Sequence, residues 1–125
     1  MASEVSAFFE TWQADRQKMK EQTPDLVRNF GAFHQSVMKE GALSVREKEL
    51  IALGIGLAHR CSPCINLHVQ GCIKAGASRE QVLEAASVAV LMQGGPAFTH
   101  VPEVLAALEY LQSKSATSAA SPPST

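Results

Sequence analysis

Hydrophobic residues recur every three to four positions along much of the 125-residue chain, which is the period of helices that bury one face. The first apolar stripe belongs to a helix that opens near Ser3. The second follows Thr23-Pro24, a pair that predicts a helix N-cap with proline at the first helical position, and we expect this helix to end at Gly41. The two stripes consist of Val5, Phe8, Phe9 and Trp12, then Leu26, Phe30, Phe33 and Val37.

The segment after Ser44 fits two kinds of secondary structure. Ser44 and Glu47 form a capping-box pattern, which predicts the start of a helix. The apolar residues that follow alternate with small ones, a pattern that also suits a strand. The cap, and the lack of a second strand-like run, favour a buried helix whose glycines allow close approach of its neighbours. The alternating residues are Ile51, Leu53, Ile55 and Leu57, separated by Ala52, Gly54 and Gly56.

Three more helices follow, each marked by end signals. Ser62-Pro63 predicts the N-cap and first residue of a helix that ends at Gly76. Ser78 and Gln81 cap the next helix, which stops at a pair of glycines. Pro102 opens the last one. The sequence therefore predicts an all-α domain of about six helices.

Composition and charge exclude several classes of protein. Eleven Lys and Arg against twelve Asp and Glu give a formal net charge of −1, so no basic excess is available for nucleic acid. No uncharged apolar run is long enough to cross a membrane, and the N-terminus lacks the basic segment of a signal peptide. We therefore expect a cytoplasmic protein with neither a nucleic-acid nor a membrane partner.

The C-terminal residues differ in composition from the rest. Residues 113–125 are Ser, Ala, Pro, Thr and Lys only, which predicts a disordered tail after a helical domain over 1–112. Without this tail, the domain is richer in apolar residues than the 46% of the whole chain. Since a small monomer cannot hide that much apolar surface, we expect a homo-oligomer.

Cys61, Cys64 and His68 carry the clearest chemical signal. On a helix they lie within about 60° of one another, so all three can face one pocket. The helix N-terminus, Arg60 and a protonated His68 each favour a reactive thiolate. By this argument Cys61, nearer the cap, is the favoured nucleophile. Once one sulfur is oxidised, the other can close a disulfide with little backbone movement. Alternatively, both cysteines are small buried apolar residues.

A zinc site is a further use of the same side chains, with Cys72 as an additional ligand. On one continuous helix Cys64 and Cys72 are about 12 Å apart along the axis, which is too far to share an ion, so we expect Cys72 to be a core thiol. A three-ligand site completed by a residue from elsewhere stays open. Glu49 also has two interpretations: an exposed member of a charge cluster, or a buried carboxylate that needs a partner.

The remaining histidines give weaker signals. His59 ends the third helix near Cys61, and it is either a helix-terminal residue or an additional catalytic base. His34 and His100 are expected to be structural or solvated. The sequence Gly94-Gly95-Pro96 predicts a turn without a ligand.

Taken together, Glu49 and Cys61-x-x-Cys64-x-x-x-His68 resemble the alkylhydroperoxidase D-like proteins of the carboxymuconolactone decarboxylase superfamily. The resemblance covers roughly residues 25–110. It implies an orthogonal helical bundle that assembles through its helices into trimers or hexamers, and a cofactor-free, thiol-dependent reduction of peroxides. It also implies that Cys64 attacks the peroxide, that Cys61 is the resolving thiol, and that His68 and Glu49 relay protons.

The implied partners are a hydroperoxide substrate and a dithiol reductant of the thioredoxin, lipoyl or glutathione type. One position departs from the pattern, because Pro63 stands where characterised peroxidase members carry a histidine. This keeps a second hypothesis open, that of an oligomeric stress protein in which the cysteine pair is a redox sensor or a holdase switch. Lactone decarboxylases of the superfamily generally lack the pair, so its presence argues against that activity.

Overall fold

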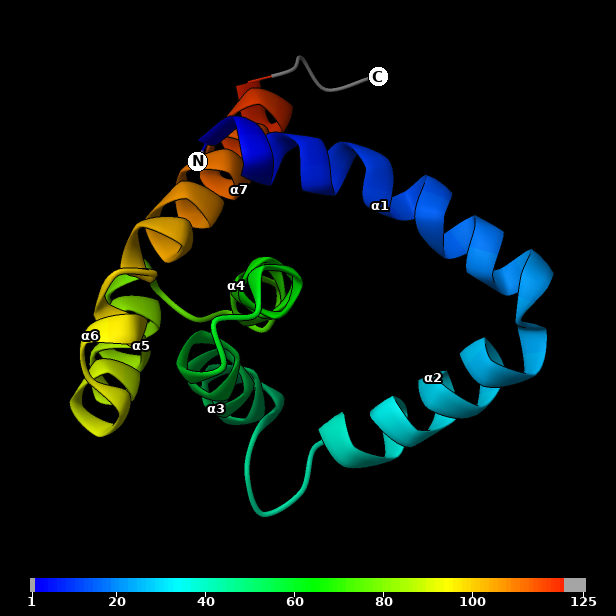
Figure 1. Cartoon of the computed structure of the whole chain (residues 1–125), viewed down its shortest axis with the longest axis horizontal. Coiled ribbons are helices and arrows are strands. Elements are labelled where there is room, and N and C mark those ends of the chain that lie inside the picture. Colours follow the sequence, from blue (N-terminus) through cyan, green and yellow to red (C-terminus); the bar gives the residue numbers. More distant parts are fainter. Residues whose placement is uncertain (1, 121–125) are drawn as a thin grey trace.

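The computed structural model describes the backbone of residues 2–120 and the side chains of residues 4–115. Within that range every regular element is a helix, which confirms the all-α prediction (Figure 1). Six helices are long and one is a single turn. They are α1 (Ala2–Gln22), α2 (Pro24–Met38), α3 (Val45–Ala58), α4 (Ser62–Lys74), α5 (Arg79–Gln93), α6 (Gly95–Phe98) and α7 (Val101–Ala120).

The core lies between α3, α4, α5 and α7, where α3 and α4 run side by side (Figure 1). The first turns of α1 close one end of it. Val5 is buried there, and the ring of Phe9 stacks on that of Tyr110 with centroids 5.2 Å apart. The largest fully buried side chains are Leu53, Leu57, Ile65, Leu108, Val69, Val82 and Val104.

Helix α3 settles the ambiguity between helix and strand. Its capping box is formed in both directions between Ser44 and Glu47, as predicted. Leu53 is fully buried, whereas Ile51 and Ile55 are about half exposed. The alternating apolar residues therefore do not share one face, because a helix turns successive even-spaced positions to different sides.

Helix α2 forms an arm outside this core. It contains no buried residue, and α1 carries it away from the other helices (Figure 1). It ends at Met38, not at Gly41, because Lys39 adopts an extended conformation with φ −65° and ψ 157°. The expected stop at Gly41 is therefore wrong by three residues.

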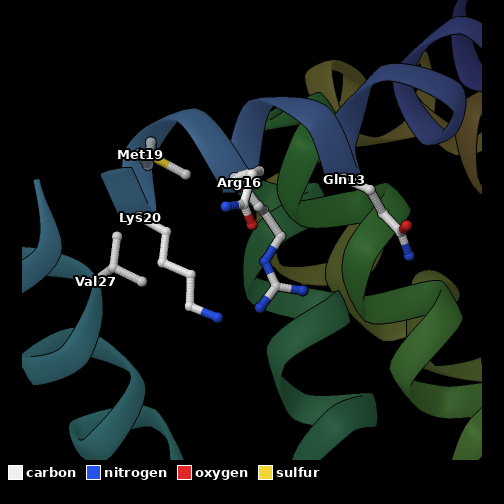
Figure 2. A pocket seen from close by; sticks show the side chains of 6 residues that line it. Gln13, Arg16, Met19, Lys20 and Val27 are labelled. Carbon is white, nitrogen blue, oxygen red and sulfur yellow. The ribbon is translucent and has the colours of Figure 1, made fainter. Parts of the chain in front are cut away.

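A cavity with charged lining residues lies where α1 meets this arm. This cavity of about 280 Å³ at the α1–α2 elbow is lined mostly by residues of α1. Figure 2 shows the side chains of Arg16 and Lys20 pointing into it. The α1 side of the elbow thus presents charged groups to the cavity.

The C-terminal helices differ from the prediction in two details. The predicted turn after Gly94 contains the single-turn helix α6, and α7 begins at Val101, one residue before Pro102. Helix α7 continues to Ala120, past residue 113, where the predicted tail begins. Alanine and lysine favour a helix, and elongation adds a backbone hydrogen bond per residue. Residues 121–125 lie outside the described part of the chain.

Candidate active site

The first turn of α4 holds the predicted cysteine pair. Cys61 and Cys64 form a disulfide with their Cα atoms 5.2 Å apart. Cys61 is also the N-cap, and its sulfur accepts a hydrogen bond from the backbone N–H of Cys64 at 3.3 Å. The pair Ser62-Pro63 predicts an N-cap at Ser62, which is wrong by one residue, because Cys61 is the last residue with extended dihedral angles. Both cysteines are half-buried.

A tight link between α3 and α4 places this turn. The backbone N–H of Arg60 donates to Leu57 O and that of Cys61 donates to Gly56 O, which is the Schellman pattern of a helix C-terminus. Arg60 occupies the left-handed position with φ 55°, where glycine is usual. Gly76, with φ 89°, fills the same position at the end of α4. The link to the cysteine pair therefore stores about 1–2 kcal/mol of backbone strain that the other end of α4 avoids.

A glycine on α3 lets the cysteine pair approach the core. A Cβ atom added at Gly56 would lie 2.9 Å from the Cβ of Cys64, closer than side chains tolerate. This confirms that a glycine of the third helix permits close approach of a neighbour. His59 and Arg60, at the end of the same helix, are exposed.

Glu49 is a buried carboxylate, so its interpretation as an exposed member of a charge cluster is wrong. Its exposed fraction is 8%, and its Oε2 lies 2.8 Å from His68 Nδ1. A carboxylate at Nδ1 orients the imidazole and leaves Nε2 as the ring nitrogen outside this contact. Cys64 and His68 are four residues apart on α4, hence neighbours on one face.

Gly71 makes room for this pair, a role that the sequence pattern did not predict. A Cβ atom at Gly71 would overlap the Glu49 carboxyl group, whose Oε1 would be 2.7 Å away. Glycine within a helix costs about 1 kcal/mol relative to alanine. An isolated glycine one turn beyond His68 is therefore the signal that could have revealed the contact.

Cys72 is a free cysteine and takes no part in the disulfide. Its side chain is fully buried, as the core-thiol prediction required. Burial, with a smaller contribution from the charge of Glu49, raises the pKa of the Cys72 thiol to about 12. The thiol thus stays protonated and unreactive at neutral pH. Among residues with described side chains, no three His, Cys, Asp or Glu groups are placed to share a metal ion.

A second acidic residue reaches the same turn of α4 from α7. The Ser62 hydroxyl donates to Glu103 Oε1 at 2.6 Å, and Glu103 is only 9% exposed. The sequence offers no signal for this contact, since glutamate in the first turn of a helix is ordinarily exposed. The other histidines lie elsewhere: His34 is exposed, and His100 Nδ1 lies 2.8 Å from Pro96 O.

Solved structures share this fold. A carboxymuconolactone decarboxylase family protein from Legionella pneumophila is 34% identical, with a TM-score of 0.80 over 86% of this chain and 96% of that one. A protein of the same family from Thermotoga maritima, for which a part in the antioxidative response has been suggested, is 30% identical. Its TM-score is 0.68 over 72% of this chain and 93% of that one. Within the described residues, no helix has the length and apolar character needed to cross a bilayer.

Relatives by sequence include an uncharacterized protein of the cox locus of Paracoccus denitrificans. It is 40% identical over 80 residues, which are 64% of this chain and 72% of the relative. An uncharacterized protein of Cupriavidus necator is 29% identical over 107 residues, which cover 74% of this chain and 95% of that one. The model of the carboxymuconolactone decarboxylase family matches residues 24–109, so the chain belongs to that family.

Proposed function

We propose that this protein is a thiol-dependent peroxidase in which Cys64 attacks the peroxide and Cys61 resolves the product. The observation that carries the proposal is the 2.8 Å contact between the buried Glu49 of α3 and the half-buried His68, which lies on the face of α4 that also bears Cys64. The disulfide joins cysteines three residues apart, and the paired imidazole lies one turn beyond the second cysteine. These groups provide the two thiols and the base that a two-thiol peroxidase uses. The antioxidative role suggested for the Thermotoga relative is consistent with it.

The reaction begins with the reduced pair. His68 Nε2 accepts the Cys64 thiol proton, and the Glu49 carboxylate stabilises the imidazolium that forms. The thiolate attacks one peroxide oxygen and the O–O bond breaks. Sulfur is thereby oxidised to sulfenic acid, and the leaving alkoxide takes the proton from His68.

The second half closes the disulfide. The Cys61 thiolate attacks the Cys64 sulfenic acid, and its hydroxyl group leaves as water after protonation. An external dithiol, or two molecules of a monothiol such as glutathione, then reduces the pair through a mixed disulfide. The sulfur atoms and the external thiols supply all the electrons, so the cycle needs no resident cofactor.

The direct test is consumption of hydrogen peroxide and an alkyl hydroperoxide with dithiothreitol, reduced lipoamide or glutathione as donor. We expect steady turnover by the native protein and none by Cys64→Ser. His68→Gln should lower the rate by about 10²–10⁴-fold, the usual contribution of a general acid–base. Absence of consumption with all three donors, or full turnover by Cys64→Ser, would contradict the proposal.

Gly71→Ala tests the geometry without removing a functional group. The added methyl group displaces the Glu49 carboxylate from His68, since all three nearest atoms belong to that carboxyl group. We expect at least a tenfold loss of turnover in a folded protein. Gly31→Ala is the matched control, because a Cβ at Gly31 meets no atom within 4 Å. Equal rates for the two variants would remove the Glu49–His68 pair from the mechanism.

The roles of the two thiols are separable by mass spectrometry. With one equivalent of peroxide, Cys61→Ser should accumulate a dimedone-reactive sulfenic acid on Cys64. Cys64→Ser should remain unmodified at Cys61. The reverse pattern would make Cys61 the attacking thiol, as its N-cap position alone would favour.

A second candidate function follows from Pro63. A proline between the cysteines has no titratable group with which to extend the proton relay. In this alternative, one peroxide molecule oxidises the cysteine pair, and the resulting disulfide changes the assembly of the protein or its binding of client proteins. No catalytic turnover follows. Stoichiometric disulfide formation with no steady-state consumption of peroxide would favour this redox switch over the peroxidase.

We also propose that the chain forms a homo-oligomer in which α2 packs on a second copy. The apolar stripe of α2 is 48–63% exposed, and an isolated helix of 15 residues is only marginally stable in water. The same chain exposes an apolar groove of about 420 Å³ between α3 and α5. The groove is lined by Leu50, Ile51, Gly54, Ile55, Ala58, Ala85, Val88, Ala89 and Met92.

A second copy is the favoured occupant because each chain carries both surfaces, and α1 holds α2 away from its own core (Figure 1). Such a head-to-tail contact closes into a ring when the rotation per subunit allows it. Sedimentation should show an oligomer that Phe30→Glu and Ile55→Glu each dissociate. Gln35→Glu adds the same charge to α2 and should leave the mass unchanged. A monomeric native protein would contradict the assembly.

A further inference from the structure

The second carboxylate near the disulfide has no part in the proposed relay. Glu103 Oε1 accepts the hydrogen bond from the Ser62 hydroxyl at 2.6 Å. Its other oxygen, Oε2, has no hydrogen-bond partner among the described residues, although Glu103 is 9% exposed. A buried carboxylate with a single hydrogen bond lowers stability relative to an apolar side chain of the same size.

The contact lies on a face of α4 different from that of Cys64 and His68. Asn66 is one turn beyond Ser62, so both project toward the same side of the helix. Asn66 is 4% exposed, and its Oδ1 also lacks a partner in the described part of the chain. The side of α4 toward α7 is therefore more polar than packing requires. Costly buried polar groups of this kind concentrate at functional sites.

We propose that Glu103 is a positioning residue for the redox pair: through Ser62 it holds the first turn of α4 in place while the disulfide is open. This inference rests on the proposed redox function of Cys61 and Cys64. Ser62 lies between the two cysteines in the chain, so fixing its side chain to α7 fixes the backbone that joins them. Glu103 makes no described hydrogen bond to either sulfur and acts on the pair through Ser62.

The need for such a hold arises from the strained link before Cys61. In the oxidised protein the disulfide keeps the two Cα atoms 5.2 Å apart. In the dithiol form that bond is absent, and Arg60 can leave its left-handed conformation of φ 55°. Because packing holds α3 and α4 in place, a change at Arg60 must be compensated at Cys61 and Ser62, and this changes the distance between Cys61 and Cys64. The Ser62–Glu103 hydrogen bond opposes this movement because it ties the turn to a different helix.

A pre-positioned Cys61 has a high effective concentration toward oxidised Cys64. Two consequences follow. The sulfenic acid on Cys64 is resolved quickly, and the equilibrium between dithiol and disulfide favours the disulfide. Loss of the hydrogen bond should therefore slow resolution and raise the reduction potential, whereas the first attack of Cys64 on peroxide should keep its rate.

The experiment measures the reduction potential of the Cys61–Cys64 pair in glutathione buffers, together with the decay of sulfenic acid after one equivalent of peroxide. For Ser62→Ala we expect a tenfold shift of the equilibrium toward the dithiol, which is about 30 mV for this two-electron couple. Resolution should slow by a similar factor. Ser62→Thr retains the hydroxyl group and should restore both values. Ser87→Ala, whose hydroxyl bonds Leu83 O within α5, is the matched control.

Glu103→Gln separates positioning from charge. Its amide oxygen can still accept the Ser62 hydrogen bond, so positioning predicts values near those of the native protein. A shift in Glu103→Gln as large as that in Ser62→Ala would assign the effect to charge and overturn the proposal. A native potential and resolution rate in Ser62→Ala would overturn it equally.

The potential is measured without peroxide, so it stays informative if the protein does not turn peroxide over. In that case the proposed peroxidase function fails and the positioning of the pair is judged by the potential alone. Circular dichroism and thermal melting of the oxidised variants establish that each is folded. Ser62 is exposed, and its replacement by alanine leaves the helix intact.

Discussion

Helices α2 and α3 both begin at predicted caps, yet they lie in opposite environments. Both start at the predicted residues and both carry several large apolar side chains. Helix α2 has the cleaner apolar stripe and buries nothing. Helix α3 has a diffuse pattern, yet it buries two leucines, a glycine and a carboxylate. Helical periodicity therefore identifies a helix and its apolar face, but it does not say whether that face is covered within the same chain.

Truncating a core residue gives the largest expected difference between the two helices. Leu57 is fully buried on α3, so Leu57→Ala should lower the free energy of unfolding by about 2–5 kcal/mol. Phe30→Ala on α2 should change it by about 0.5 kcal/mol or less in the monomer. Urea denaturation at low protein concentration makes the comparison.

Raising the protein concentration sharpens this comparison. If α2 packs on a second copy, the cost of Phe30→Ala should increase with concentration, because association adds to the stability of the native chain only. A cost equal to that of Leu57→Ala under monomeric conditions would mean that α2 is covered by its own chain.

Alanine at a glycine should have opposite signs on the two helices. At Gly56 of α3 the new methyl group meets Cys64, and we expect a loss of about 1–3 kcal/mol from overpacking. At Gly31 of α2 there is open space, so Gly31→Ala should gain up to about 1 kcal/mol of helix propensity. Thermal and chemical denaturation measure both. Equal effects would show that the environments do not differ.

The N-caps should differ by a smaller amount. The Ser44 side chain accepts a hydrogen bond from the Glu47 N–H, so Ser44→Ala should cost about 1 kcal/mol. Thr23 caps α2 by position only and makes no side-chain capping bond. Its hydroxyl bonds Met19 O instead. We expect Thr23→Ala to cost only a few tenths of a kcal/mol on the scale of cap substitutions, as measured by denaturation.

The smallest expected effect is the pH dependence of the α3 cap. The backbone and side-chain hydrogen bonds of Ser44 lower the pKa of Glu47. The ionised carboxylate thus contributes stability that is present above the ordinary glutamate pKa and is lost as the pH falls through the lowered one. Glu47→Gln keeps a capping acceptor and should flatten this part of the stability curve. If the stability of Glu47→Gln falls at low pH as steeply as that of the native protein, Glu47 is not the source of this pH dependence.

The sequence predicted the helix ends better than the contacts between helices. Both capping boxes, at Ser44 and Ser78, are formed as expected, because their donors and acceptors lie within four residues. The end of α2 at Met38 was missed, since a glycine shortly beyond a helix is a frequent stop signal but not an obligatory one. Gly71 and Glu103 were also missed, because each acts on a residue of another helix.

By itself the sequence determined that the chain is helical, and that Cys61, Cys64 and His68 share the start of one helix. These properties depend on hydrogen bonds and side-chain spacing within a turn or two. Only the tertiary structure decided that Glu49, 19 residues away, pairs with His68, and that Glu103, 41 residues from Ser62, reaches the same turn. The physical reason is that such contacts depend on how closely the helices approach, which local periodicity does not specify.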